Sequence, residues 1–127
     1  MNDKVTIMGT EYIISYSKYD EDIFTNSRGE SLCGYCSPSA KHIAICNMES
    51  FPGWEKEDIK TCRESEKETL RHEIVHAFLH ECGLADNTFN VERGGWANNE
   101  EMVDWIATQG EKIYKAWEDV GALVKNI

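Results

Sequence analysis

Residues 64–82 constrain the fold of this 127-residue chain more than any other stretch. Apolar side chains recur there every three or four positions, which is the period of a helix that buries one face. They are Leu70, Ile74, Ala77, Phe78 and Cys82, and Val75 and Leu79 widen the same face. Gly83 follows directly and can adopt the left-handed conformation that ends helices. We therefore predict a long buried helix, against which the rest of the chain packs.

The middle of this predicted helix reads His72-Glu73-Ile74-Val75-His76. Residues four apart lie on one face of a helix, about 6 Å apart along its axis, so both imidazoles can bind one metal ion. Glu73 is rotated by about 100° from His72 and points beside the metal, where it can take a proton from a water molecule. The pattern predicts a zinc site at His72 and His76, with Glu73 as the catalytic base.

A catalytic zinc site needs a third protein ligand. His80 lies about 12 Å along the axis from His72, which is too far for one ion to bind all three histidines. The acidic residues Glu100, Glu101 and Asp104 are the alternatives. Glu100 and Asp104 are four apart and share a face, which suits a metal ligand paired with a carboxylate that holds the far nitrogen of a histidine. Glu101 remains open as the ligand.

These two motifs resemble those of the gluzincins, which are zinc peptidases with a glutamate as third ligand. The first motif is His72-Glu73-x-x-His76, and the second, Asn-Glu-x-x-x-Asp, matches Asn99, Glu100 and Asp104. The short gap between them is more like the compact phage and bacterial proteins of the ImmA/IrrE type, or the minigluzincins. The resemblance implies a zincin-like fold, zinc held by His72, His76 and Glu100, Glu73 as general base and Asp104 as the orienting carboxylate.

The resemblance also implies that a peptide or protein is the substrate and that a tyrosine or histidine stabilises the oxyanion. Four residues are candidates for that role, namely Tyr16, Tyr35, His80 and Tyr114. A second function stays open, in which the chain is a phage or bacterial regulatory binding protein with a structural or vestigial zinc site. A third is a latent enzyme whose cleft is blocked by a terminal segment.

The remaining pattern predicts an α+β domain over residues 1–127. The β-branched and aromatic runs at 5–8 and 12–16 predict a hairpin. Residues 32–37 and 42–47 are expected to form two more short strands, which gives an antiparallel or mixed sheet of three to four strands. We expect His42–Cys46 to be an edge strand able to bind a peptide in extended form. A loop over 86–97 and two further helices, at 98–108 and 111–124, follow, and Gly110 breaks or kinks their join.

Charge and cysteine content narrow the class of protein. The net charge of −10 argues against binding to nucleic acid or to anionic membranes. Five cysteines and no apolar N-terminal signal argue against a disulfide framework. Cys33-Gly34-Tyr35-Cys36 has the spacing of a zinc knuckle or redox pair, but reduced thiols that fill the core are the simpler interpretation. No run approaches the length of about 20 apolar residues of a membrane helix, so we expect a cytoplasmic protein.

Overall fold

The computed structural model describes residues 3–85 and 95–124, and its strands precede its helices, as the sequence predicts. Strands β1 (Lys4–Ile7), β2 (Thr10–Ser17), β3 (Gly34–Ser37) and β4 (His42–Cys46) come first. A short 3-10 helix η1 (Met48–Ser50), helix α1 (Ile59–Glu81), a second 3-10 helix η2 (Trp96–Asn98) and helix α2 (Glu100–Asp119) follow. The predicted α+β class is confirmed, whereas the predicted loop over 86–97 lies mostly outside the described residues.

The four strands form one mixed sheet in the order β1-β2-β4-β3. β1 and β2 are the predicted antiparallel hairpin, β2 and β4 run parallel, and β3 returns antiparallel to β4. The expectation that His42–Cys46 is an edge strand was wrong, because β4 lies between β2 and β3. Its residues Ile43 to Cys46 are all buried, which is the pattern of a strand covered on both faces. The edge strands are therefore β1 and β3.

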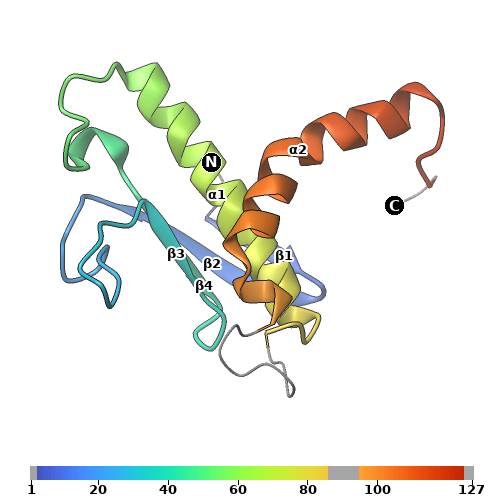
Figure 1. Cartoon of the computed structure of the whole chain (residues 1–127), viewed down its shortest axis with the longest axis horizontal. Coiled ribbons are helices and arrows are strands. Elements are labelled where there is room, and N and C mark those ends of the chain that lie inside the picture. The colour runs from blue at the N-terminus through green and yellow to red at the C-terminus, as the bar shows by residue number, and fades with distance from the viewer. Residues whose placement is uncertain (1–2, 86–94, 125–127) are drawn as a thin grey trace.

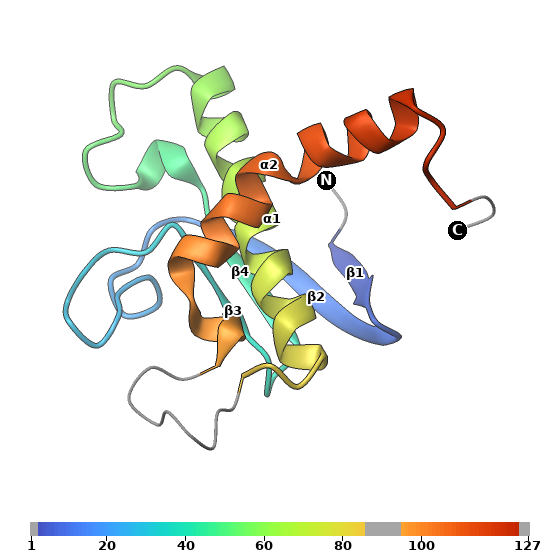
Figure 2. The same ribbon diagram turned by 45° about the vertical axis from the view of Figure 1, so that its right-hand side comes forward.

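Helix α1 covers one face of this sheet, as Figure 1 and Figure 2 show. Ile43 and Ile45 of β4 pack there against Ala77 of α1, with Leu70 and Ile74 at the margin of the cluster. The opposite face is covered by loop residues, and its cluster is built on Phe24, Ala44 and Cys46. The predicted helix thus packs on the sheet, but it is less buried than expected: of its predicted apolar residues only Ala77 is fully buried, whereas Phe78 and Cys82 are exposed.

Helix α1 begins earlier than the apolar pattern indicates. Asp58 caps it, since its carboxylate accepts a hydrogen bond from the backbone N–H of Thr61 at 2.7 Å. The helix ends at Glu81, and Gly83 follows with a φ of 80°, as predicted for a terminating glycine.

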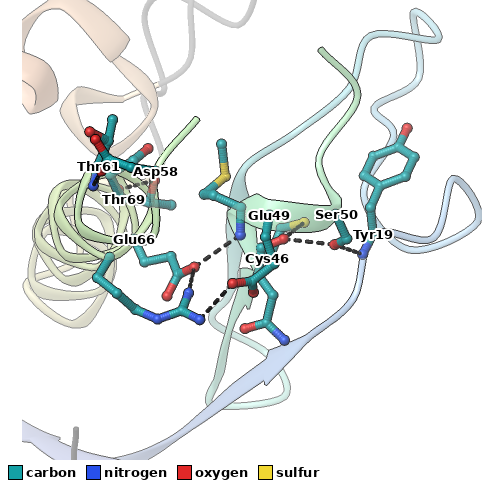
Figure 3. Close-up of polar contacts among 12 residues, drawn as sticks. Tyr19, Cys46, Glu49, Ser50, Asp58, Thr61, Glu66 and Thr69 are labelled. Atoms are coloured by element: carbon teal, nitrogen blue, oxygen red, sulfur yellow. Dashed lines mark hydrogen bonds and ion pairs between the residues drawn. The ribbon is translucent and has the colours of Figure 1, made fainter. Parts of the chain in front are cut away.

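A buried carboxylate ties the first half of α1 to η1 (Figure 3). Glu66 accepts a hydrogen bond from the backbone N–H of Met48 at 2.9 Å and also pairs with Arg63. Arg63 in turn pairs with Glu49 of η1 at 2.7 Å. These contacts fix the first turns of α1 to η1. They lie on the side of α1 that faces away from α2 (Figure 3).

Helix α2 is one continuous helix, so the prediction of two helices at 98–108 and 111–124 was wrong. A glycine inside a helix costs only about 1 kcal/mol relative to alanine, less than the four unpaired donors and acceptors at each new helix end. Gly110 is therefore accommodated, although α2 bends along its length and its second half extends away from the sheet (Figure 1). In the described part of the chain, neither α-helix has a stretch long and apolar enough to cross a bilayer.

Candidate metal centre

The first turns of α2 cross α1 beside its two histidines. The Nε2 atoms of His72 and His76 lie 3.1 Å apart, and their rings meet edge to face with centroids 4.8 Å apart. Both side chains are largely shielded from solvent. The spacing of four residues has therefore brought both imidazoles to one point, as the motif predicts.

The carboxylate of Glu100 meets both histidines at that point. Its Oε2 atom lies 3.2 Å from Nε2 of His72, and its Oε1 atom lies 2.6 Å from Nε2 of His76. Donor atoms around a tetrahedral zinc, with bonds of about 2.0–2.1 Å, are about 3.3 Å apart. Two of the three separations are within about 0.2 Å of that value, and the third, between Glu100 and His76, would have to widen by about 0.7 Å to hold such an ion. Glu101 is exposed, and no described contact joins it to the histidines.

The far nitrogen of each histidine is held by an acceptor. Nδ1 of His72 lies 2.7 Å from Oδ1 of Asp104, and Nδ1 of His76 lies 2.5 Å from the carbonyl oxygen of Ala97 in η2. An acceptor at Nδ1 keeps the proton there and leaves the lone pair of Nε2 directed at the metal position. The sequence did not predict the contact of Ala97 with His76, because Ala97 contributes only its backbone carbonyl. Any residue type could supply that group.

Glu73 lies beside the histidines, and the residue as a whole is 7% exposed. Among the described residues it has no hydrogen bond or ion pair. Burial raises the pKa of Glu73 to about 7, and the negative charges of Glu100 and Asp104 add to this rise while His72 opposes it. One ligand atom from each of His72, Glu73 and His76 lies within 4.8 Å of the others, so this group could hold a metal ion.

The cluster opens into a cleft of about 710 Å³. Its walls are the α2-facing side of α1, the first turns of α2, and the segment that leads into β3, with Trp54 nearby. A cleft of this size holds several side chains of an extended peptide or a compact small molecule.

None of the four candidates for oxyanion stabilisation is among the described residues that line the cleft. Tyr16 packs with the core beneath α1, and Tyr35 packs with Phe24 on the opposite face of the sheet. Tyr114 is exposed on the second half of α2, and His80 lies on α1 one turn beyond His76.

All five cysteines carry free thiols. Cys36 packs against the core beneath α1, whereas Cys33 lies just before β3 and lines the cleft. Within residues 3–85 and 95–124, the only cluster with metal-binding geometry is the one on α1. The spacing of Cys33 and Cys36 therefore gives no second metal site in this part of the chain.

No protein-family model, curated protein or solved structure matches the chain. Function is therefore inferred from the motif, the geometry of the cluster and the shape of the cleft.

Proposed function

We propose that the protein is a zinc-dependent peptide-bond hydrolase of the gluzincin type. One observation carries the proposal: the Nε2 atoms of His72 and His76 and the carboxylate of Glu100 converge beside an unpaired, buried Glu73 at the end of a cleft. Two imidazoles and one carboxylate are a donor set of catalytic zinc sites, which leave a fourth position open. Imidazole nitrogens favour zinc over the oxygen-seeking ions calcium and magnesium.

His72, His76 and Glu100 would hold the ion, and Asp104 and the carbonyl of Ala97 would keep the two imidazoles in the binding tautomer. When bound, zinc would polarise the scissile carbonyl and acidify water in the site. The carboxylate of Glu73 would take the proton from the attacking water and return it to the leaving amine. A base with a pKa near neutrality can do both, which agrees with the raised pKa of Glu73.

The sheet supports binding of an extended peptide. β3 is an edge strand, so one side of its backbone is free to pair with another strand. Residues 31–33, which lead into β3, and Gly34, its first residue, line the same cleft as the metal cluster. β3 therefore takes the peptide-binding role that the sequence suggested for His42–Cys46.

Substitution of Glu73 by glutamine tests this mechanism directly. Zinc content should stay near one ion per chain, whereas hydrolysis of an unfolded protein such as casein should fall by a factor of about 10² to 10⁴. Glu101→Gln removes the same charge from an exposed position near the site and should keep activity. Full turnover by the Glu73→Gln protein would eliminate the proposed mechanism.

The alternative, a regulatory binding protein with a structural zinc, draws support from one observation. Glu73 lies close enough to the histidines to be a fourth protein ligand, and a site closed in that way has no place for water. The same variant separates the two functions, because loss of a ligand weakens zinc binding and loss of a base does not. A fall in zinc affinity of tenfold or more in Glu73→Gln would favour the binding protein.

A further inference from the structure

The apolar face of α2 continues past the part of the helix that packs on α1. The two buried residues of α2, Val103 and Ala107, both lie in its first half. The second half extends away from the sheet and from α1 in both views of the molecule (Figure 1, Figure 2). No residue between 111 and 124 is buried. The second half of α2 is therefore a projecting helix whose apolar side is largely uncovered by the described part of the chain.

Five residues form one stripe along this side, the last of them directly after the final turn of α2. Ile106, Gly110, Ile113, Trp117 and Val120 follow one another at intervals of four, three, four and three. Side chains at such intervals lie on one face of a helix, and two helices that pack side by side show this pattern. We call these five residues the α2 seam. Trp117 is 55% exposed and Val120 is 78% exposed.

The projecting half of α2 ends at a defined cap. Gly121 has a φ of 70°, and the backbone N–H of Ala122 donates a hydrogen bond to the carbonyl oxygen of Trp117 at 2.9 Å. These are the features of a Schellman cap, which ends a helix at a fixed residue. A helical segment of only about ten residues is marginal in water on its own, because helices in proteins depend on the packing of an apolar face. The α2 seam therefore needs a surface to pack against.

The exposed area of the seam matches the share of one partner in a dimer interface. Together with Tyr114, which flanks it and is 54% exposed, the seam exposes roughly 500 Å², given the sizes of aromatic and aliphatic side chains. Interfaces are about 60% apolar, so a patch of this size corresponds to about 800 Å² per copy. Each partner contributes about that area to an interface of standard size.

The charges around the seam do not oppose the pairing of two copies, although the whole chain carries a net charge of −10. Residues 111–119 contain two lysines and three acidic residues, so this segment is close to neutral. Lys115 pairs with Asp119, and Arg71 of α1 lies 3.7 Å from Glu111. A second copy therefore meets little repulsion at this end of α2. An anionic membrane is a poorer match, because helices that bind one carry an excess of lysine and arginine on the polar face.

From these observations we propose that the chain forms a symmetric dimer in which the α2 seam of one copy packs against the α2 seam of the other. A two-fold pair uses the same surface on both copies, so a seam that is apolar along its length is its own partner. Trp117 is the largest side chain of the seam, and buried tryptophans contribute much of the binding energy of interfaces. A Cβ atom at Gly110 would have no atom within 4 Å, and this open position lets the second helix approach closely.

Sedimentation velocity of the full chain, from nanomolar to high micromolar concentration, tests the dimer. The unsubstituted protein should dimerise with a dissociation constant in the micromolar range or tighter, as interfaces of this size do. Trp117→Ser should weaken association at least tenfold. The matched control is Trp105→Ser, which removes an indole that is 59% exposed and points about 100° away from Ile106, and it should leave association unchanged. A protein that stays monomeric throughout the series, or a dimer equally stable in both variants, would overturn the inference.

Hydrogen exchange of the unsubstituted protein gives a second test that does not depend on the folding of a variant. Backbone amides of residues 110–120 should exchange several-fold more slowly above the dissociation constant than far below it, because pairing stabilises this part of α2. Amides of the hairpin of β1 and β2, which lies outside the seam, should exchange alike at both concentrations. Exchange of 110–120 that is independent of concentration in a protein that dimerises would place the interface elsewhere and overturn the inference.

Discussion

The Nδ1 atom of His72 lies 2.7 Å from Oδ1 of Asp104, and Asp104 lies one turn beyond Glu100 on the same face of α2. One short segment of α2 therefore presents one carboxylate to Nε2 of His72 and a second to its Nδ1. The crossing of α1 and α2 is what completes the cluster.

Replacing Asp104 by asparagine should weaken zinc binding by a factor of about 10 to 100, because carboxylates that orient ligand histidines commonly have effects of that size. Competition with a chromophoric chelator measures the affinity. Asp119→Asn, on the exposed end of the same helix, is the matched control and should leave affinity unchanged. Equal affinities for all three proteins would show that Asp104 does not orient His72 for binding.

The choice between Glu100 and Glu101 can be decided with two isosteric variants. Glu100→Gln should reduce zinc affinity by at least tenfold, since among the carboxylates that the structure describes only that of Glu100 forms ion pairs with both histidines. Glu101→Gln should retain it, because Glu101 is exposed. A larger loss of zinc affinity in Glu101→Gln than in Glu100→Gln would identify Glu101 as the ligand.

The buried carboxylate of Glu73 should destabilise the metal-free protein at neutral and alkaline pH. Its pKa rises from 4.5 to about 7 in the folded chain, so the folded state holds its proton more tightly than the unfolded state. The resulting stabilisation is fully present below pH 4.5 and is lost as pH rises through 7. In chelator-treated protein at pH 8, Glu73→Gln should raise the free energy of unfolding by roughly 3 kcal/mol, measured in urea. A variant less stable than the parent at pH 8 would contradict this account.

Glu81 should make the fold sensitive to acid. Lys41 and then Tyr12 donate hydrogen bonds to its carboxylate at 2.8 Å each, and these bonds hold the pKa of Glu81 at about 2 instead of 4.5. The sign is opposite to that of Glu73: the stabilisation is present above pH 4.5 and is lost as pH falls toward 2. The thermal midpoint of Glu81→Gln should therefore fall less than that of the parent between these two pH values. Parallel curves would exclude Glu81 as a source of acid sensitivity.

Gly34 should tolerate no side chain, because β3 approaches α1 closely at this position. A Cβ atom there would lie 2.7 Å from the carbonyl oxygen of Ala44 and 2.7 Å from Cγ2 of Thr69. Gly34→Ala should cost about 1–3 kcal/mol of stability in urea denaturation, since overpacking displaces backbone. Thr69→Ser removes the Cγ2 contact and should restore part of the loss in the double variant, and purely additive effects would argue against a contact between β3 and α1 as the cause.

The amino-acid sequence alone determined the features that depend on local spacing. The period of residues 64–82 indicated α1, the interval between His72 and His76 placed them on one face, and the interval between Glu100 and Asp104 did the same on α2. The β-branched and aromatic runs at 5–8 and 12–16 likewise indicated the hairpin of β1 and β2. Each of these relationships spans only a few residues, where the geometry of a single helix or hairpin is decisive.

Only the tertiary structure decided which groups from distant segments meet. It selected Glu100 over Glu101 as the carboxylate facing the histidines, supplied the Ala97 carbonyl, and placed β4 inside the sheet with β3 at its edge. Neighbouring acids on one helix differ by about 100° in direction, so the angle at which α2 crosses α1 determines which one points inward. That angle depends on the simultaneous packing of many side chains from both helices and the sheet. No local spacing along the chain encodes it.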